Sequence, residues 1–150
     1  MKRLVVSLAF VIAVAAAATP AFAQQSGHVR VEFQGPGGHS SGAYGRVSAL
    51  HAAARAVILI QKALPGGSYQ IMNLTGGNSV NSIASDGLIE LKLNAANAAA
   101  YKELVAAVTK AAAEGAAAEN AFRGVKAGDL TAGAPATVRS TVTPFLSGAQ

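Results

Sequence analysis

Hydrophobic and polar residues alternate along short segments of the chain, and each such segment is predicted to be a β-strand. Residues 28–34 carry valine and phenylalanine on one side and charged or amide side chains on the other. Residues 88–93 alternate in the same way, and residues 69–75 are rich in strand-forming side chains. A period of two is typical of strands with one buried face. The pattern therefore predicts a sheet with one covered face and one open face.

Two longer segments repeat their hydrophobic residues every three to four positions, as amphipathic helices do. The first covers residues 46–64 and is followed by Pro65, which ends a helix. The second covers residues 96–118 and is rich in alanine. Either Asn94 or Asn97 can cap it, because a short amide side chain accepts a free backbone N–H in the first turn.

The remaining strand is predicted over residues 122–126. Beyond Gly128 the chain is rich in threonine, alanine and proline, and residues 135–150 are expected to form a loosely ordered tail, with residues 137–143 as its one candidate strand. The order strand, helix, strand, strand, helix, strand predicts an α+β fold. Its four-stranded antiparallel sheet would carry both helices on one face, in a ferredoxin-like βαββαβ arrangement.

The first 23 residues have the three-part pattern of a secretory signal peptide. Lys2 and Arg3 precede an apolar run over residues 4–18, and small residues lead to Ala23. A membrane-spanning helix is the alternative, but the run has 15 residues and a bilayer needs about 20. We expect cleavage after Ala23, a periplasmic or secreted protein, and no membrane attachment after cleavage.

Charge and composition exclude several classes of function. The chain has 12 basic and 7 acidic residues, and loss of Lys2 and Arg3 with the signal leaves 10 against 7, a net charge of +3. The remaining cations are scattered without interleaved aromatic residues, so no nucleic-acid surface is expected. The chain has no cysteine, which excludes disulfides and thiolate zinc sites. Its three histidines lack metal-ligand spacing, so neither a metal nor another cofactor is expected.

Two glycine-rich loops are the segments most relevant to function. Residues 35–42 read Gly-Pro-Gly-Gly-His-Ser-Ser-Gly, and residues 76–82 read Gly-Gly-Asn-Ser-Val-Asn-Ser. Backbone N–H groups in such loops can point at an anion or a carbonyl oxygen. The first loop lacks the Gly-Lys-Ser/Thr ending of a phosphate loop. A plain connector remains the alternative for each loop.

Together, the first strand, the Gly-Gly-His-Ser loop, the alanine-rich helix and the Gly-Gly-x-x-x-Asn loop resemble the dimerisation, or lid, domain of the zinc aminoacylase, carboxypeptidase G and tripeptide aminopeptidase family. The resemblance implies a lid domain over residues 24–134. It implies that His39 polarises the scissile carbonyl in a partner's active site, and that Asn81 binds substrate there. The residues that the resemblance assigns to substrate or partner binding are His39, Asn81, Lys92, Gly37, Gly38, Gly76 and Gly77.

The chain also departs from the family's pattern. It has no His-x-Asp motif and no Glu-Glu pair, which the zinc-bearing catalytic domain of that family supplies. Lys92 stands where the family often has an arginine, and lysine lacks the planar fork that binds a carboxylate with two hydrogen bonds. We therefore expect an exported lid-type domain that is not catalytic by itself.

Three functions remain open at this point. The leading expectation is a homodimer that associates through alanine-rich helix surface and an unpaired sheet edge. The second is a lid subunit that serves a separate zinc-peptidase catalytic chain. The third is a small module that binds peptides or anions with its two glycine loops.

Overall fold

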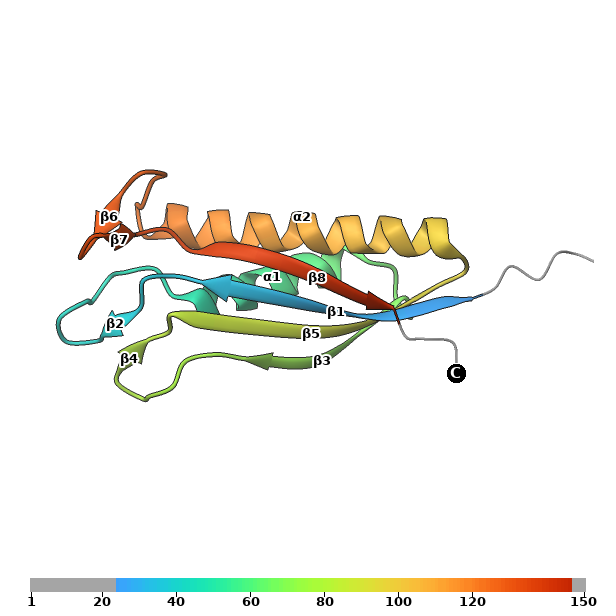
Figure 1. The fold of residues 1–150 in the computed structure, drawn as a ribbon, viewed down its shortest axis with the longest axis horizontal. Coiled ribbons are helices and arrows are strands. Elements are labelled where there is room, and N and C mark those ends of the chain that lie inside the picture. The colour runs from blue at the N-terminus through green and yellow to red at the C-terminus, as the bar shows by residue number, and fades with distance from the viewer. Residues whose placement is uncertain (1–23, 147–150) are drawn as a thin grey trace, which may run out of the picture.

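The computed structural model describes residues 24–146, and their central feature is a four-stranded antiparallel sheet in the order β3-β5-β1-β8. Both long helices cover one face of this sheet (Figure 1). The α+β, ferredoxin-like arrangement expected from the sequence is therefore confirmed. The elements are β1 (Gln25–Gln34), β2 (Gly38–His39), α1 (Ala49–Ala63), β3 (Tyr69–Thr75), β4 (Ser82–Ile83), β5 (Asp86–Ala95), α2 (Ala98–Phe122), β6 (Leu130–Thr131), β7 (Ala134–Pro135) and β8 (Arg139–Leu146).

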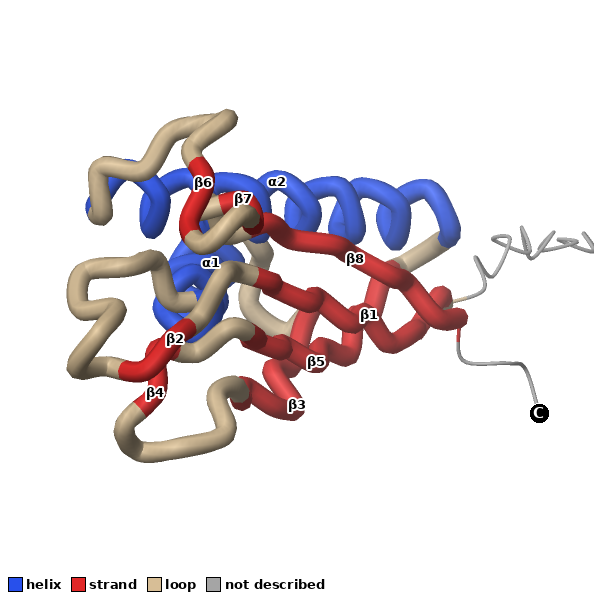
Figure 2. Tube along the Cα trace, turned by 60° about the vertical axis from the view of Figure 1, so that its left-hand side comes forward, coloured by secondary structure: helices blue, strands red, loops and turns tan. Residues whose placement is uncertain are grey.

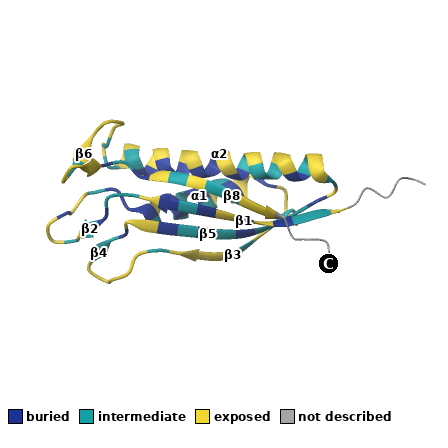
Figure 3. Cartoon of the chain, viewed as in Figure 1, coloured by how far each residue is buried: buried dark blue, intermediate teal, exposed yellow. Residues whose placement is uncertain are grey.

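Alternation along β1 and β5 places the core between the sheet and the helices. Val29, Val31 and Phe33 of β1 are buried, whereas the residues between them are more exposed. Strand β5 alternates in the same way, and β1 pairs with it along its whole length. Figure 3 shows buried residues on the sheet and helix surfaces that face each other. The open face of the sheet keeps the polar side chains, as the pattern predicts.

Helices α1 and α2 approach each other closely because small residues line their contact. A Cβ atom at Gly115 of α2 would lie 2.8 Å from the backbone nitrogen of Ala56 in α1. Ala52 and Ala112, on the same helices, are fully buried. Alanine-rich helix surface, which the sequence suggested for association between copies, is thus used within the chain. The N-caps are Ser48 for α1 and, as one of the two expected asparagines, Asn97 for α2.

The fourth strand of the sheet is β8, and the predicted strand over residues 122–126 is wrong. Helix α2 continues to Phe122, and Gly124, with φ +68°, follows it in the left-handed conformation. The amide of Val125 donates to the Asn120 carbonyl, which closes the end of the helix as a Schellman motif does.

Strand β8 also corrects the expectation of a loosely ordered tail. It pairs in regular antiparallel register with β1, from Gly27↔Leu146 to Gln34↔Arg139. The candidate strand at residues 137–143 overlaps β8 over residues 139–143. The Asn120 side chain accepts from the Val138 amide at 2.8 Å and donates to its carbonyl at 3.0 Å, which fixes the entry to β8 on the end of α2.

The predicted signal peptide, residues 1–23, and residues 147–150 lie outside the described part of the chain. Among residues 24–146, no helix combines the length and apolar character that crossing a bilayer requires.

Candidate functional site

The two glycine-rich loops lie side by side at one end of the sheet (Figure 2). A short antiparallel bridge joins them, in which Gly38 of β2 pairs with Ile83 of β4 and His39 pairs with Ser82. The Ser40 amide also donates to the Asn81 carbonyl at 2.9 Å. Segments more than forty positions apart in the sequence therefore form one surface.

Glycine is required in both loops for conformation and for space. Gly37 and Gly77 have φ of +59° and +74°, a left-handed conformation that side chains disfavour. At Gly38, whose φ is +149°, a Cβ atom would lie 2.6 Å from the Cβ of Ala43. A Cβ atom at Gly76 would lie 2.5 Å from a backbone oxygen of β5. These four predicted residues shape the loops through their backbones.

His39 and Asn81, the two side chains singled out by the resemblance, are in contact. The Nε2 atom of His39 lies 3.1 Å from the side-chain amide of Asn81, and both residues are exposed. A hydroxyl from Ser79 reaches the other side of the same amide. The pair thus forms a small polar surface at the tip of the joined loops.

Ser41 holds the other side of the His39 ring. Its backbone nitrogen lies 3.2 Å from His39 Nδ1, and its hydroxyl lies 2.7 Å from the same atom. A backbone N–H can only donate, and the Asn81 Nδ2 group that faces Nε2 can also only donate, so donors face both ring nitrogens and a neutral ring can accept from only one of them. No acidic group is among the hydrogen-bond partners of His39 in residues 24–146. The ring therefore lacks the acidic partner that orients the base of a catalytic triad.

Lys92 is not brought to this site. It lies near the opposite end of β5, where it is level with His28 of β1 and Gln70 of β3. The two loops, in contrast, follow the ends of β1 and β3 at Gln34 and Thr75. The structure therefore groups His39 and Asn81 with the four glycines and leaves Lys92 on the sheet.

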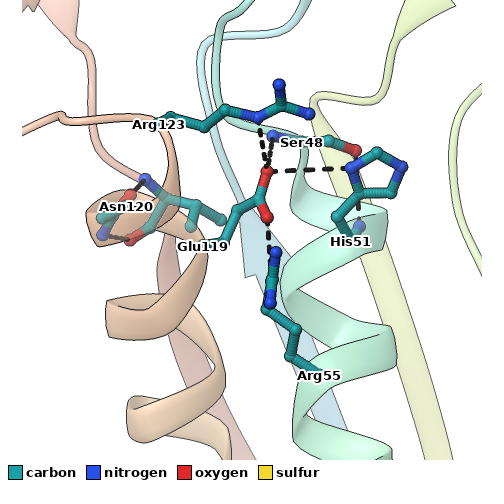
Figure 4. Close-up of polar contacts among 7 residues, drawn as sticks. Ser48, His51, Arg55, Glu119, Asn120 and Arg123 are labelled. Carbon is teal, nitrogen blue, oxygen red and sulfur yellow. Dashed lines mark hydrogen bonds and ion pairs between the residues drawn. The ribbon is translucent and has the colours of Figure 1, made fainter.

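A buried carboxylate beneath the loops was not foreseen from the sequence. Glu119 of α2 has no exposed side-chain surface, and its oxygens accept from the Ser48 amide at 3.2 Å, from Arg55 at 3.0 Å and from Arg123 at 3.2 Å. Figure 4 shows that these groups converge on the carboxylate from α1 and from the last turn of α2. His51 Nδ1 lies 3.7 Å away. The one cue in the sequence is Arg123, which lies four positions after Glu119 and can pair with it on one face of a helix.

The electrostatics of this cluster favour the ionised form of Glu119. Burial raises the pKa of the carboxyl, but the hydrogen bonds from Ser48, Arg55 and Arg123 and the charge of Arg123 outweigh it. Together they hold the pKa below its ordinary value of 4.5. Glu119 is therefore an anionic link between the two helices.

The described residues do not fit a metal site. Across residues 24–146, no three His, Asp or Glu side chains lie together in a way that could hold a metal ion. The zinc that the resemblance implies would be held by a different domain of that family.

Comparison with known protein families decides the family of the chain. Residues 24–120 match the family model described as the peptidase dimerisation domain. The chain belongs to this family. The match covers the sheet strands β1, β3 and β5, helix α1 and most of α2, with both glycine loops. A comparison with curated proteins gave no match.

Solved structures of larger enzymes contain the same fold as this peptidase dimerisation domain. An aminobenzoyl-glutamate utilization protein from Klebsiella pneumoniae is 16% identical with a TM-score of 0.62, over 85% of this chain and 30% of that protein. A tripeptidase from Staphylococcus aureus is 18% identical with a TM-score of 0.62, over 83% of this chain and 29% of that protein. A hydantoinase/carbamoylase family amidase from Burkholderia ambifaria is 20% identical with a TM-score of 0.63, over 83% of this chain and 28% of that protein. The chain thus spans less than a third of the length of each.

Proposed function

We propose that this protein is an association module in which two copies pair along the free edge of β3. Strand β3 is an edge of the sheet, and its sequence, Tyr-Gln-Ile-Met-Asn-Leu-Thr, contains no charge and no proline. Met72 and Leu74 expose about half of their surface, 53% and 41%. A long, uncharged edge strand with exposed apolar side chains is a template for pairing with another strand. This edge is the observation that carries the proposal.

The other edge of the sheet is less suited to pairing. Strand β8 contains Pro144, which has no backbone N–H and interrupts a ladder of hydrogen bonds. In addition, β8 packs against α2, which covers that side of the sheet. The two edges therefore differ in a way that favours a closed dimer through β3 over an open chain of copies.

The family of the chain supports association as its primary role. The family is named for dimerisation, and the chain spans less than a third of the enzymes that share its fold. In this proposal the described domain holds copies together and performs no hydrolysis by itself.

Light scattering on residues 24–150, which contain every element of the described fold, tests the proposal. We expect twice the chain mass at tens of micromolar and a shift toward the monomer in a Met72→Lys variant, which places a charge on the edge. Leu130→Lys is the matched control, because Leu130 is exposed in β6, away from β3 (Figure 1). A strict monomer for the unaltered protein contradicts the proposal.

A second function is supported by the contact between His39 and Asn81. In this alternative the domain is the lid of a zinc peptidase whose catalytic chain is separate, and the two side chains bind the substrate carbonyl there. Mixing the two chains would then raise peptidase activity, and His39→Ala would abolish the gain without changing the mass of the lid domain. Co-purification that yields no such chain argues against this alternative.

We also propose that the protein is exported and cleaved after Ala23, which leaves it in the periplasm or outside the cell. The sequence pattern supports this, because Lys2 and Arg3 precede an apolar run over residues 4–18 and small residues lead to Ala23. The intact mass of the exported protein tests the proposal: a chain that begins at Gln24 agrees with it, and one that retains Met1 contradicts it.

A further inference from the structure

A groove of about 620 Å³ lies between the two glycine loops, the start of α1 and the end of α2. Its volume is within the range of about 300–1,000 Å³ that small-molecule sites occupy. Arg46, His51 and Arg123 line it, and no aspartate or glutamate is among its lining residues. Neither His39 nor Asn81 lines it. The groove is therefore distinct from the polar pair at the loop tip.

The groove keeps a positive charge although a carboxylate lies beneath it. Glu119 is contacted by both Arg55 and Arg123, so two positive charges face its single negative charge. Arg46, which lies between β2 and α1, adds a further positive charge. Because Glu119 has no exposed side-chain surface, it orients the cations from below and does not present its own charge to the groove.

Arg123 is held with its donor groups available. Its Nε atom donates to Glu119 at 3.2 Å, and its guanidinium lies 5.0 Å from the centre of the Phe122 ring. Figure 4 shows its terminal nitrogens on the side away from Glu119. Arg46 donates to the Gly37 carbonyl of the first loop through a long contact of 3.4 Å. A guanidinium that is already oriented binds a carboxylate with little further loss of conformational freedom.

The rest of the lining combines apolar side chains and glycines with uncharged polar residues, which are Ser40, Ser48, Asn78, Ser79 and Ser82. Leu50, Ile83 and Ala84 lie along the groove, and Tyr44 and Val80 stand almost fully exposed beside it. An inorganic ion would leave these surfaces in water. A ligand with an anionic group and a short apolar body would use both kinds of surface.

We propose that this groove binds a small carboxylate with a short apolar chain. Its carboxylate contacts the guanidinium groups of Arg46 and Arg123, and its chain lies against Leu50 and Ile83. This inference does not depend on dimerisation, since all of these residues belong to one copy.

Titration of ¹⁵N-labelled residues 24–150 with hexanoate, followed by NMR, tests the proposal. We expect saturable shifts of the backbone amides in residues 76–80 and of Arg123 Nε–H. Acetate should bind about tenfold more weakly because it lacks the apolar chain. Hexylammonium, which has the chain but the opposite charge, should not produce the saturable shifts. Flat titrations, or equal binding of hexanoate and hexylammonium, would overturn the proposal.

Three variants separate the groove from general electrostatic attraction. Arg46→Gln should weaken hexanoate binding about tenfold, because it removes a charged hydrogen-bond donor. Val80→Glu should also weaken it, since it places a carboxylate beside the groove at a fully exposed position that the core does not need. Lys62→Gln is the control, because it removes a cation from α1 outside the groove. Equal losses for Lys62→Gln and Arg46→Gln would contradict a specific site.

Discussion

Glu119 is the residue on which the end of the helix pair depends. Replacing it by Gln keeps its volume but leaves Arg55 and Arg123 without a charged partner in a partly buried cluster. We expect Glu119→Gln to lower the free energy of unfolding by about 2–3 kcal/mol, measured by urea denaturation at pH 7. Glu114→Gln is the control, since Glu114 forms an exposed pair with Lys110 at 3.8 Å and should lose less than about 0.5 kcal/mol.

The lowered pKa of Glu119 also predicts how stability depends on pH. A carboxyl whose pKa is lower in the folded state stabilises the fold fully above its unfolded pKa, near 4.5, and loses this contribution as the pH falls through the folded pKa. Denaturation from pH 7 to pH 3 should therefore show the gap between the unaltered protein and Glu119→Gln closing below pH 4.5. A gap that widens toward acid pH would contradict the assignment.

The contacts of His39 with Ser41 and Asn81 predict how its tautomers respond to substitution. The Ser41 amide donates to Nδ1 and favours the Nε2–H form, whereas the Asn81 Nδ2 group faces Nε2 as a donor and favours the Nδ1–H form. We expect Asn81→Ala to raise the Nε2–H fraction of the neutral ring, because only the Ser41 donor then remains. Long-range ¹H–¹⁵N NMR distinguishes the two ring nitrogens. An unchanged or lower Nε2–H fraction would contradict the contact between the two side chains.

The sequence supported the candidate site unevenly. His39 and Asn81 were named through a family resemblance, because nothing local relates residues 42 positions apart until β2 and β4 pair. Lys92 was grouped with them from its motif alone, and the strand register places it elsewhere. Glu119 went unnoticed because burial of a charge depends on which helix face packs inward, and that requires the position of α1.

At the scale of elements, the crossing of α1 and α2 rests on Gly115. Helix propensity alone would make Gly115→Ala stabilising by about 1 kcal/mol. A Cβ atom at this position would however lie 2.8 Å from both the nitrogen and the Cβ of Ala56, so the helices would have to move apart. We expect Gly115→Ala to lower the melting temperature, although alanine has the higher helix propensity. The control is Ala113→Gly at an exposed position of the same helix, where the melting temperature should follow helix propensity alone and fall. An increase for Gly115→Ala would contradict the close contact.

Alternation of hydrophobic and polar residues predicts the strands that have one buried face. It does not predict where helix α2 ends or that β8 is a strand. Phe122 and Val125 suggested a strand, but alanines and other helix-forming residues carry α2 to Phe122, and Gly124 then ends it. Strand β8 contains Pro144 and several polar residues, and neither feature indicates a strand in the sequence. A proline is tolerated there because β8 is an edge strand. Edge position is a property of the whole sheet and cannot be read from one segment.

At the scale of the molecule, the dimer edge and the loops are connected. Strand β3 ends at Thr75, directly before the loop that carries Gly76, Gly77 and Asn81. Pairing along β3 would therefore place the second copy beside that loop. The proposed dimer and the exposed His39–Asn81 pair lie on neighbouring parts of one surface, which gives the domain a means to present the pair next to a partner.

Cross-linking through single cysteines on β3 tests the proposed dimer most directly. The chain has no cysteine, so a single cysteine at each position from 69 to 75 in turn introduces a unique thiol. In an antiparallel pair with two-fold symmetry, a residue at or next to the axis faces its own copy, and paired strands lie about 5 Å apart, within the span of a disulfide. We predict that at least one of these variants forms a disulfide-linked dimer much faster than Leu130→Cys, an exposed control in β6. Equal or slower cross-linking of every variant would contradict pairing of two copies along β3.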